Sequence, residues 1–293
     1  MAVILVTGAN GQLGAELVPL LRSVGTVVAT DRGTLDIGDA GAVAGVLREL
    51  RPSIVVNAAA YTAVDRAESE PEQAFAINAV APGVLAEEAK RAGALFVHYS
   101  TDYVFDGRSR VPYVEDSPPS PLSVYGASKL EGEQRIDASG AQALVFRTSW
   151  VYGLRGANFL VTIKRLAAER DELRIVDDQV GVPNWSRALA RATCSVLGLG
   201  REALAERVGL YHLSCGGEAT WYRFAQAFLR DTPRVRVLPI ATSDYPTPAR
   251  RPSYGVLDTG KFFRTFGFAL PDWRAALDEC LASPALTAPS AVG

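Results

Sequence analysis

The chain has 293 residues, of which 48% are hydrophobic and 21% charged, and its formal net charge is −2. This composition is typical of an ordered globular protein with a sizeable core, and it argues against nucleic acid or an anionic membrane as partner. Three cysteines without a Cys-x-x-Cys spacing and only two histidines exclude a disulfide framework and a zinc site. No apolar stretch approaches the roughly 20 residues that span a bilayer. We expect a cytoplasmic protein with a small-molecule ligand.

The first expected elements are a strand and a helix joined by a glycine-rich loop. Residues 3–6 form a short apolar run, Gly8, Gly11 and Gly14 follow at GxxGxxG spacing, and a helical apolar pattern continues to residue 22. Glycines at such a turn let the backbone approach a pyrophosphate, whose charge then meets the helix N-terminus. The spacing departs from the strict GxGxxG fingerprint, but the strand–loop–helix context is the one the motif requires. The sequence therefore predicts a dinucleotide-binding loop, the alternative being an ordinary turn.

A second strand at residues 26–30 ends at Asp31 and Arg32. An acidic residue about 20 residues past the glycines accepts hydrogen bonds from the adenosine ribose, whereas an arginine neutralises the 2′-phosphate of NADPH. Because the chain carries both residues, the expected cofactor is NADPH or NADH, with the preference left open. Asp36 and Ile37 are expected to flank the adenine ring.

Strands and helices continue to alternate as far as residue 148. Apolar strand-like runs lie at residues 53–57, 94–100 and 143–148, and a helical pattern covers residues 72–91. This alternation predicts an α/β fold with a Rossmann-like doubly wound parallel sheet, whose ligands bind at the carboxyl ends of the strands. Residues 1–152 form the expected NAD(P)-binding domain.

Tyr125 and Lys129 are four residues apart in the segment before the last of these strands. This spacing puts phenol and ammonium on one helix face, where the ammonium favours the phenolate and lowers the tyrosine pKa from roughly 10. The pair suits carbonyl reduction, in which the developing alkoxide needs a proton. Thr101 is expected to hydrogen-bond the same carbonyl oxygen, and Trp150 to face a sugar ring. Tyr-x-x-x-Lys alone equally fits an ordinary amphipathic helix.

The alternation is less regular over residues 153–283, which predicts a smaller C-terminal substrate-binding lobe that crosses back to the sheet. Helical patterns begin near residues 158, 185 and 221. Arg250 and Arg251 lie in a proline-punctuated loop and are suited to bidentate contacts with a diphosphate, the alternative being a solvated basic turn. Residues 284–293 are rich in alanine, proline and serine and are expected to form a mobile tail.

Taken together, these segments resemble the extended short-chain dehydrogenase/reductases and, within them, the dTDP-4-dehydrorhamnose reductase family. The resemblance covers nearly the whole chain and rests on residues 8–14, 57–68, 100–107, 125–129, 147–152, 176–179 and 245–252. It implies NAD(P)H-dependent reduction of the C4 keto group of dTDP-4-dehydro-β-L-rhamnose, giving dTDP-L-rhamnose. The alternatives are a 4-ketoreductase acting on another dTDP-deoxysugar of secondary metabolism, and a non-catalytic nucleotide-binding regulatory subunit.

The resemblance also implies roles for individual residues. The catalytic residues are Thr101, Tyr125 and Lys129, with Tyr125 as proton donor, and their presence weighs against the regulatory subunit. The sequence pattern and the resemblance together predict as cofactor-binding residues Gly8, Asn10, Gly11, Gln12, Leu13, Gly14, Asp31, Arg32, Asp36, Ile37, Ala60, Tyr61, Thr62, Tyr99, Tyr125 and Lys129. The substrate-binding residues are Thr101, Asp102, Tyr103, Tyr125, Trp150 and Arg251.

Some members of this family are described as dimers that use a divalent metal bound by carboxylates. Glu16 lies where one such carboxylate is expected, but Arg187 stands where a second would be. One carboxylate beside an arginine is a poor magnesium site. The sequence therefore predicts no metal and either a monomer or a weak homodimer.

Overall fold

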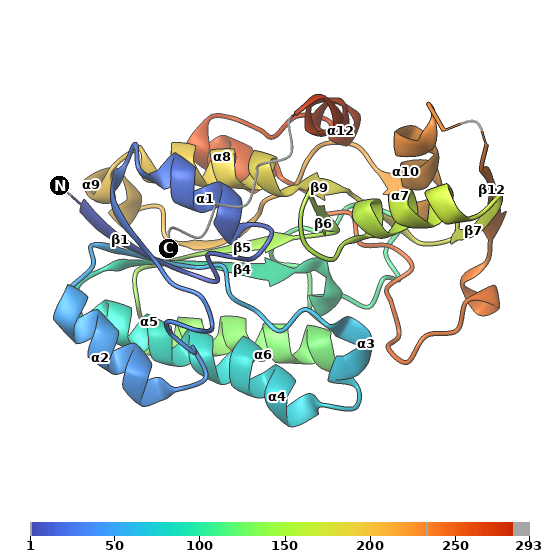
Figure 1. Ribbon diagram of the computed structural model, residues 1–293. Coiled ribbons are helices and arrows are strands. Elements are labelled where there is room, and N and C mark those ends of the chain that lie inside the picture. The colour runs from blue at the N-terminus through green and yellow to red at the C-terminus, as the bar shows by residue number, and fades with distance from the viewer. Residues whose placement is uncertain (1, 233, 284–293) are drawn as a thin grey trace.

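The structure is a computed structural model that describes residues 2–232 and 234–283, so the predicted mobile tail lies outside the described residues. A six-stranded parallel sheet in the order β10-β5-β4-β3-β1-β2 forms its centre (Figure 1). The strands are β1 (Ala2–Thr7), β2 (Gly25–Ala29), β3 (Ile54–Asn57), β4 (Leu95–Thr101), β5 (Ala143–Thr148) and β10 (Gly209–His212). The predicted fold class is confirmed.

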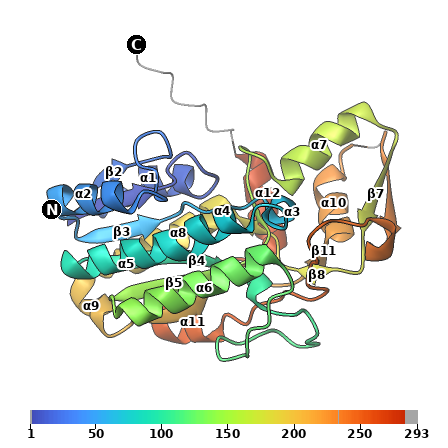
Figure 2. The same ribbon diagram turned by 90° about the horizontal axis from the view of Figure 1, so that it is seen from below.

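Helices cover both faces of the sheet. They are α1 (Gly14–Leu21), α2 (Ala40–Leu50), α3 (Val64–Ala67), α4 (Pro71–Phe75), α5 (Ala81–Arg91), α6 (Val124–Ser139), α8 (Ser186–Leu197), α9 (Arg201–Ala205) and α11 (Gly260–Phe266). The last helix, α12 (Trp273–Ala282), packs instead into the core of the C-terminal lobe. In Figure 1, α1 and α8 lie above the sheet and α2, α5 and α6 lie below it, and Figure 2 shows the lower layer from beneath. This arrangement is a doubly wound sheet.

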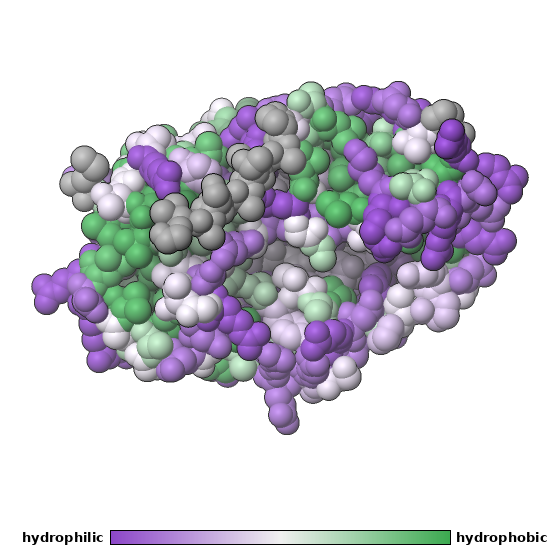
Figure 3. Space-filling view, viewed as in Figure 1, coloured by the Kyte–Doolittle hydropathy of each residue, from purple (hydrophilic) through white to green (hydrophobic). Residues whose placement is uncertain are grey.

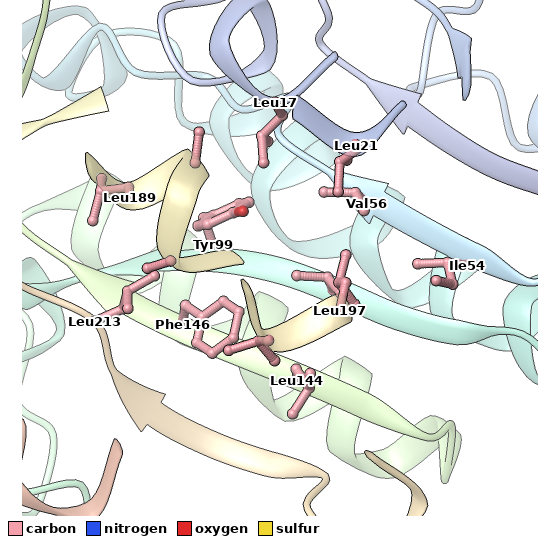
Figure 4. Packing of buried hydrophobic residues seen from close by; sticks show 14 of the residues in the cluster. Leu17, Leu21, Ile54, Val56, Tyr99, Leu144, Phe146, Leu189, Leu197 and Leu213 are labelled. Carbon is pink, nitrogen blue, oxygen red and sulfur yellow. The ribbon is translucent and has the colours of Figure 1, made fainter. Parts of the chain in front are cut away.

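Each face of the sheet has its own apolar core. Leu17 and Leu21 of α1 and Leu189 of α8 pack against Val56 and Phe146 of the strands (Figure 4). On the opposite face, side chains of α2 and α5 pack against the alternate residues of the same strands. Strands buried on both sides read as continuous apolar runs, which is why the sequence predicted them well.

A serine and a glycine set the two ends of α6, the helix that contains Tyr125 and Lys129. The Ser123 hydroxyl accepts from the Gly126 N–H at 3.2 Å, and Gly140 ends the helix with a φ of 62°. Both features are common helix boundaries, because the cap satisfies a free N–H and glycine adopts the left-handed conformation without strain. Tyr125 and Lys129 therefore occupy the first two turns of a helix whose start is fixed.

The helix predicted over residues 72–91 is interrupted. Between α4 and α5 the chain forms a π-helical turn, Ala76–Val80, that adds a residue to the helical repeat. Asn78 in this turn accepts from the backbone N–H of Tyr61 and donates to its carbonyl, each at 2.9 Å. The turn thus anchors the loop after β3.

The second half of the chain forms a lobe and also returns to the sheet. The lobe contains α7 (Phe159–Glu169), α10 (Trp221–Leu229), β6 (Val151–Tyr152), β7 (Glu172–Val176), β8 (Val180–Gly181), β9 (Asn184–Trp185), β11 (Ala219–Thr220) and β12 (Arg236–Ile240). Strands β7 and β12 pair in parallel, and a separate apolar core fills the lobe. In contrast, β10 pairs with β5 of the main sheet and α8 packs on α1. Within residues 2–232 and 234–283, none of the helices has the length and apolar content needed to cross a membrane.

Candidate active site

The polar residues that follow the parallel strands gather at one edge of the sheet. Thr7, Asn57, Thr101 and Thr148 end β1, β3, β4 and β5, and their strands pair in register. The carboxyl ends of parallel strands form the usual ligand crevice of an open α/β sheet. The molecular face in Figure 3 is hollowed near its middle, between the sheet and the lobe.

The glycine loop is packed too tightly for larger residues. Gly8 has a φ of 68°, and a Cβ there would lie 2.6 Å from the backbone nitrogen of Ala59. A Cβ on Gly14 would lie 2.1 Å from the Gly8 carbonyl oxygen. The loop thus has a bare backbone surface at the start of α1, which fits the pyrophosphate of a dinucleotide.

Residues around this loop are held in place by their own hydrogen bonds. Asn10 donates to the Asp31 carboxylate, which also accepts from the Gly33 N–H at 3.0 Å. Hydrogen bonds, chiefly from Thr34, lower the pKa of Asp31. Gln12 accepts from Asn158, the N-cap of α7, at 2.9 Å. The structure therefore presents an ionised carboxylate at the end of β2, where a ribose would bind.

The other predicted cofactor residues are divided between the crevice and the core. The Arg32 side chain is 82% exposed and lies 3.7 Å from Asp36, so it is available to a ligand phosphate. Ile37 and Leu13 are buried among apolar side chains. Ala60, Tyr61 and Thr62 follow β3, and the Tyr61 hydroxyl donates to Glu70 at 2.6 Å.

The Thr101 hydroxyl lies near the Tyr125 phenol and favours the phenolate. Removal of the phenol from water has the larger effect and raises the pKa of Tyr125 to about 12. The sequence-based expectation of a lowered Tyr125 pKa is therefore wrong for this structure, because desolvation outweighs the favourable contacts. Tyr125 carries its proton at neutral pH.

Lys129 is buried beneath the pair. Its Nζ donates to the carbonyl oxygen of Tyr99 at 2.5 Å and lies 3.1 Å from Nε2 of His98. Burial lowers the pKa of Lys129 to about 8, against a smaller opposing effect of Glu133. The Tyr99 phenol itself lies in the α8 core, hydrogen-bonded to Thr193, so only the Tyr99 backbone is near Lys129.

Asp102 and Tyr103 extend the site beyond Thr101. Asp102 accepts from the Thr101 hydroxyl at 3.1 Å and is 2% exposed, and burial raises its pKa to about 7. The Tyr103 ring meets the Tyr125 ring edge to face at 5.6 Å. A carboxyl group that is partly protonated at neutral pH therefore lies next to the hydroxyl pair.

Trp150 and Arg251 both face the lobe. Trp150 has a φ of 41° and stacks on Trp221 with ring centroids 3.5 Å apart. Arg251 donates to both Asp65 oxygens, at 3.1 and 2.8 Å. Trp221 and Arg251 line a cavity of about 650 Å³ whose other walls include Phe159, Arg174, Gln179 and Tyr245. Arginines and aromatic rings around one cavity suit a nucleotide diphosphate.

Glu16 is already engaged by a protein cation. Arg187 Nε donates to its carboxylate at 2.8 Å, and both side chains are largely buried. A carboxylate held by a guanidinium has little capacity left for a divalent cation. The donor set at this position therefore does not fit magnesium.

The sequence reading missed Asn57, His98 and Asn78. Each is a polar residue within an otherwise apolar run, and each is at most 1% exposed. Buried polar side chains are nearly always hydrogen-bonded, so such interruptions are a usable signal for a polar network. The hydrogen-bond partners of Asn57, His98 and Asn78 lie on other helices, strands or loops, so the sequence alone did not identify them.

A glycine cradle, a carboxylate just after β2 and a Thr–Tyr pair above a buried lysine are typical of a nicotinamide-dependent reductase of the short-chain class. The family model described as the RmlD substrate binding domain matches residues 1–285. A dTDP-4-dehydrorhamnose reductase of Burkholderia thailandensis is 47% identical over 290 residues, covering 95% of this chain and 97% of the relative. One of Escherichia coli K12 is 44% identical, with 95% and 96% covered.

Solved structures agree with these sequence matches. A dTDP-4-dehydrorhamnose reductase of Clostridium acetobutylicum superimposes with a TM-score of 0.90 at 40% identity, covering 95% of this chain and 98% of that one. The Bacillus anthracis reductase, solved in complex with NADP, gives 0.88 at 35% identity, with 96% and 98% covered. The chain belongs to the dTDP-4-dehydrorhamnose reductase family.

Proposed function

We infer that this protein reduces the C4 keto group of dTDP-4-dehydro-β-L-rhamnose with NADPH or NADH and forms dTDP-L-rhamnose. Full-length similarity to reductases of this name supports the reaction. The observation that carries the chemistry is the placement of Thr101 at the end of β4 beside Tyr125, with the buried Lys129 one turn further along α6.

The residues present fit the cofactor. Gly8, Gly11 and Gly14 would accommodate the pyrophosphate, Asp31 the adenosine ribose, and Lys129 the nicotinamide ribose. When bound, the reduced cofactor supplies the hydride. Tyr125 donates its hydroxyl proton to the substrate oxygen, and the Thr101 hydroxyl positions that oxygen by a hydrogen bond. A tyrosine that keeps its proton at neutral pH is ready for this step.

The lobe cavity is the proposed site of the dTDP group. Phe159 and Trp221 offer apolar surface for the base, while Arg251 offers a positive charge for the diphosphate. Asp65 keeps Arg251 oriented through two hydrogen bonds. Asp102, Tyr103 and Trp150 lie between this cavity and Tyr125 in the proposed arrangement and would contact the sugar.

Turnover of the defined substrate tests the function. The protein is incubated with dTDP-4-dehydro-L-rhamnose and either reduced cofactor, and cofactor absorbance and the product's NMR spectrum are followed. We expect cofactor oxidation only when the keto sugar is present, with dTDP-L-rhamnose as product. Formation of a different C4 epimer would instead assign the chain to another dTDP-deoxysugar.

We also propose a cytoplasmic location and a monomer or weak homodimer that needs no metal. The Arg187–Glu16 ion pair supports the metal-free assembly. Sedimentation velocity with magnesium and with EDTA tests it, and the two profiles should coincide. A dimer that dissociates in EDTA would contradict this proposal.

A further inference from the structure

The indole of Trp150 is covered on one face by Trp221. The two rings stack with centroids 3.5 Å apart and an angle of 9° between their planes. Trp150 lies between β5 and β6, whereas Trp221 is the first residue of α10 and lines the lobe cavity. The stack therefore joins the end of the main sheet to one wall of that cavity.

Gly181 of β8 covers the opposite face of the same indole. A Cβ at Gly181 would lie 2.6 Å from Cε2 of Trp150, 2.7 Å from Cζ2 and 2.9 Å from Nε1. Cε2 is set back between the other two atoms, so an approach in the ring plane would bring Cζ2 and Nε1 closer than Cε2. The glycine thus lies over the ring face, and Trp221 at stacking distance leaves it no room on the same side. Trp150 is held between a glycine and a second indole.

The backbone of Trp150 is strained in this position. Its φ of 41° lies in the left-handed region, which costs free energy for a bulky residue. Such strain persists only where the surrounding structure fixes the residue, and it is concentrated at functional sites. The contacts of the indole with Trp221 and Gly181 provide that fixation.

Trp221 is held in turn by the segment at residues 176–179. Its Nε1–H donates to Oε1 of the buried Gln179 at 3.2 Å. Asp177 accepts from the hydroxyl of Thr220, the N-cap of α10 directly before Trp221. Both the ring of Trp221 and the start of its helix are therefore fixed from the lobe side.

We propose that Trp221 and Gly181 are positioning residues for Trp150: by covering both faces of its indole, they leave only the ring edge to contact the sugar of the substrate. The proposal rests on the reductase function inferred above, in which Trp150 lies between the lobe cavity and Tyr125. Because Trp221 also lines the cavity proposed for the dTDP group, the edge has a fixed position relative to the nucleotide. This edge orients the C4 keto group at the proton donor, and orientation governs the rate of the chemical step.

NMR spectroscopy tests the arrangement of the rings. The chain has four tryptophans, so selective labelling gives few indole signals, which Trp150→Phe and Trp221→Phe assign. We expect NOEs between the two rings and an upfield-shifted Gly181 Hα signal, because protons over an aromatic face are shielded. Both features should remain when dTDP is bound. Their absence from the free protein, or their loss on addition of dTDP, would overturn the proposal.

Gly181→Ala displaces Trp150 without altering the nucleotide cavity. Gly181 has no left-handed φ and is not among the cavity residues, and the three atoms nearest to its Cβ position all belong to Trp150. We expect kcat to fall by roughly 10- to 100-fold, as a shift of about 1 Å in a reacting group can do, with the Kd of dTDP and of NADPH unchanged. A wild-type kcat in Gly181→Ala would overturn the proposal.

Gly216→Ala is the matched control for this change. Gly216 also lies outside the left-handed region, and the nearest atom to its Cβ position is 3.8 Å away, an ordinary contact distance. We expect Gly216→Ala to keep the wild-type kcat. Equal losses of kcat in the two variants would show that the response is not specific to the Trp150 contact and would overturn the proposal.

A double variant tests whether Gly181 acts through Trp150. Trp150→Phe has a smaller ring that leaves room for the methyl group, so Gly181→Ala added to Trp150→Phe should lower kcat no further. Losses that multiply would show that the two residues act independently and would reject the positioning role. If Gly181→Ala alone does not fold, the double variant should fold, and failure of both would also overturn the proposal.

The test of the proposed function is separate. The NOEs and the Kd of dTDP are measured without turnover. A wild-type protein that keeps the stack with dTDP but does not reduce dTDP-4-dehydro-L-rhamnose would refute only the proposed function. The kinetic comparison would then use the dTDP-4-keto sugar that the protein does reduce.

Discussion

Tyr125 depends on its surroundings in a way that its spacing from Lys129 did not reveal. Four residues place the two groups on one face of α6, but Lys129 reaches His98 and the Tyr99 carbonyl, and the phenol lies beside Thr101. Desolvation then determines the ionisation of the phenol and raises its pKa to about 12. At the scale of single residues, the site therefore consists of a protonated Tyr125 hydroxyl and the buried Nζ of Lys129.

Tyr125→Phe should lower kcat by roughly 10²- to 10⁴-fold with little change in cofactor Kd, because the ring is kept and only the transferable proton is lost. Single-turnover kinetics and cofactor titration measure the two effects. Tyr113→Phe is the matched control, since its hydroxyl bonds to Asp106. Wild-type turnover by Tyr125→Phe, when chemistry limits the rate, would assign the acid to another group.

Asp102 should make stability depend on pH. Burial raises its pKa to about 7 in the folded state, against roughly 3.9 in the unfolded chain. The folded state therefore holds the extra proton between these values, so this group's contribution to stability is complete below pH 4 and is lost as the pH rises to about 7.

Asp102→Asn lacks this titration, and its Tm relative to the wild type should increase by roughly 5 °C between pH 4 and pH 8. Calorimetry at several pH values measures the difference. A constant Tm difference across this range would show that the carboxyl group stays ionised in the folded protein.

Arg32→Ala should weaken NADPH more than NADH. The guanidinium is exposed and close to Asp36, whereas Asp31 is held by its own hydrogen bonds and is unaffected by the change. Loss of a charged hydrogen bond predicts roughly a tenfold decrease in kcat/KM for NADPH. Equal losses for both cofactors would show that Arg32 does not reach the 2′ position.

At the scale of elements, the glycine loop has the strictest requirement for its residue types. Gly8 and Gly14 lie against backbone atoms that cannot move without displacing β3 or α1. In contrast, Gly45 in α2 has nothing within 4 Å of the position of a Cβ, so no contact there requires glycine. Gly14 in α1 and Gly45 in α2 are therefore expected to respond in opposite ways to the addition of a methyl group.

Gly14→Ala should destabilise the protein by about 1–3 kcal/mol and abolish tight cofactor binding, because the methyl group overlaps the Gly8 carbonyl. Gly45→Ala should stabilise it by about 0.5–1 kcal/mol, since alanine reduces the backbone entropy lost in a helix. Denaturant unfolding measures both changes. Similar behaviour of the two variants would contradict this account of the loop.

At the scale of the molecule, sheet and lobe meet through a few specific contacts. Trp150 after β5 stacks on Trp221 of α10, and Asp65 of α3 pairs with Arg251 of the late loop. Both contacts border the region between Tyr125 and the lobe cavity. In the proposed function, substrate binding and the relative placement of the two parts therefore depend on the same side chains.

Arg251→Ala should raise KM for the sugar nucleotide by roughly 10- to 100-fold, the usual cost of a lost charged hydrogen bond, without affecting cofactor Kd. Arg250→Ala is the matched control, because the exposed Arg250 is adjacent in sequence and carries the same charge. Steady-state kinetics measure both. Equal effects of the two changes would indicate a general electrostatic role of the loop.

The sequence predicted local features well and tertiary contacts poorly. Strands such as residues 143–148 and the helix starting after Asn158 follow from apolar periodicity and capping. The family resemblance predicted that Thr101 and Tyr125 belong to one site, and in the structure the two side chains are neighbours. The His98–Lys129 contact, the π turn at Asn78 and the Trp150–Trp221 stack depend on how separate elements pack, which periodicity does not encode.

The position of β10 in the sequence affects how the sheet assembles while the chain is being synthesised. Its partner β5 ends at residue 148, but β10 covers residues 209–212, so a ribosome must add about 60 residues before that edge is paired. Until then the backbone groups of β5 that later pair with β10 are unpaired, a common starting point for mispairing. Protection of β5 by a chaperone, or rapid synthesis of the residues between β5 and β10, would therefore affect the yield of folded protein more than the stability of the finished sheet does.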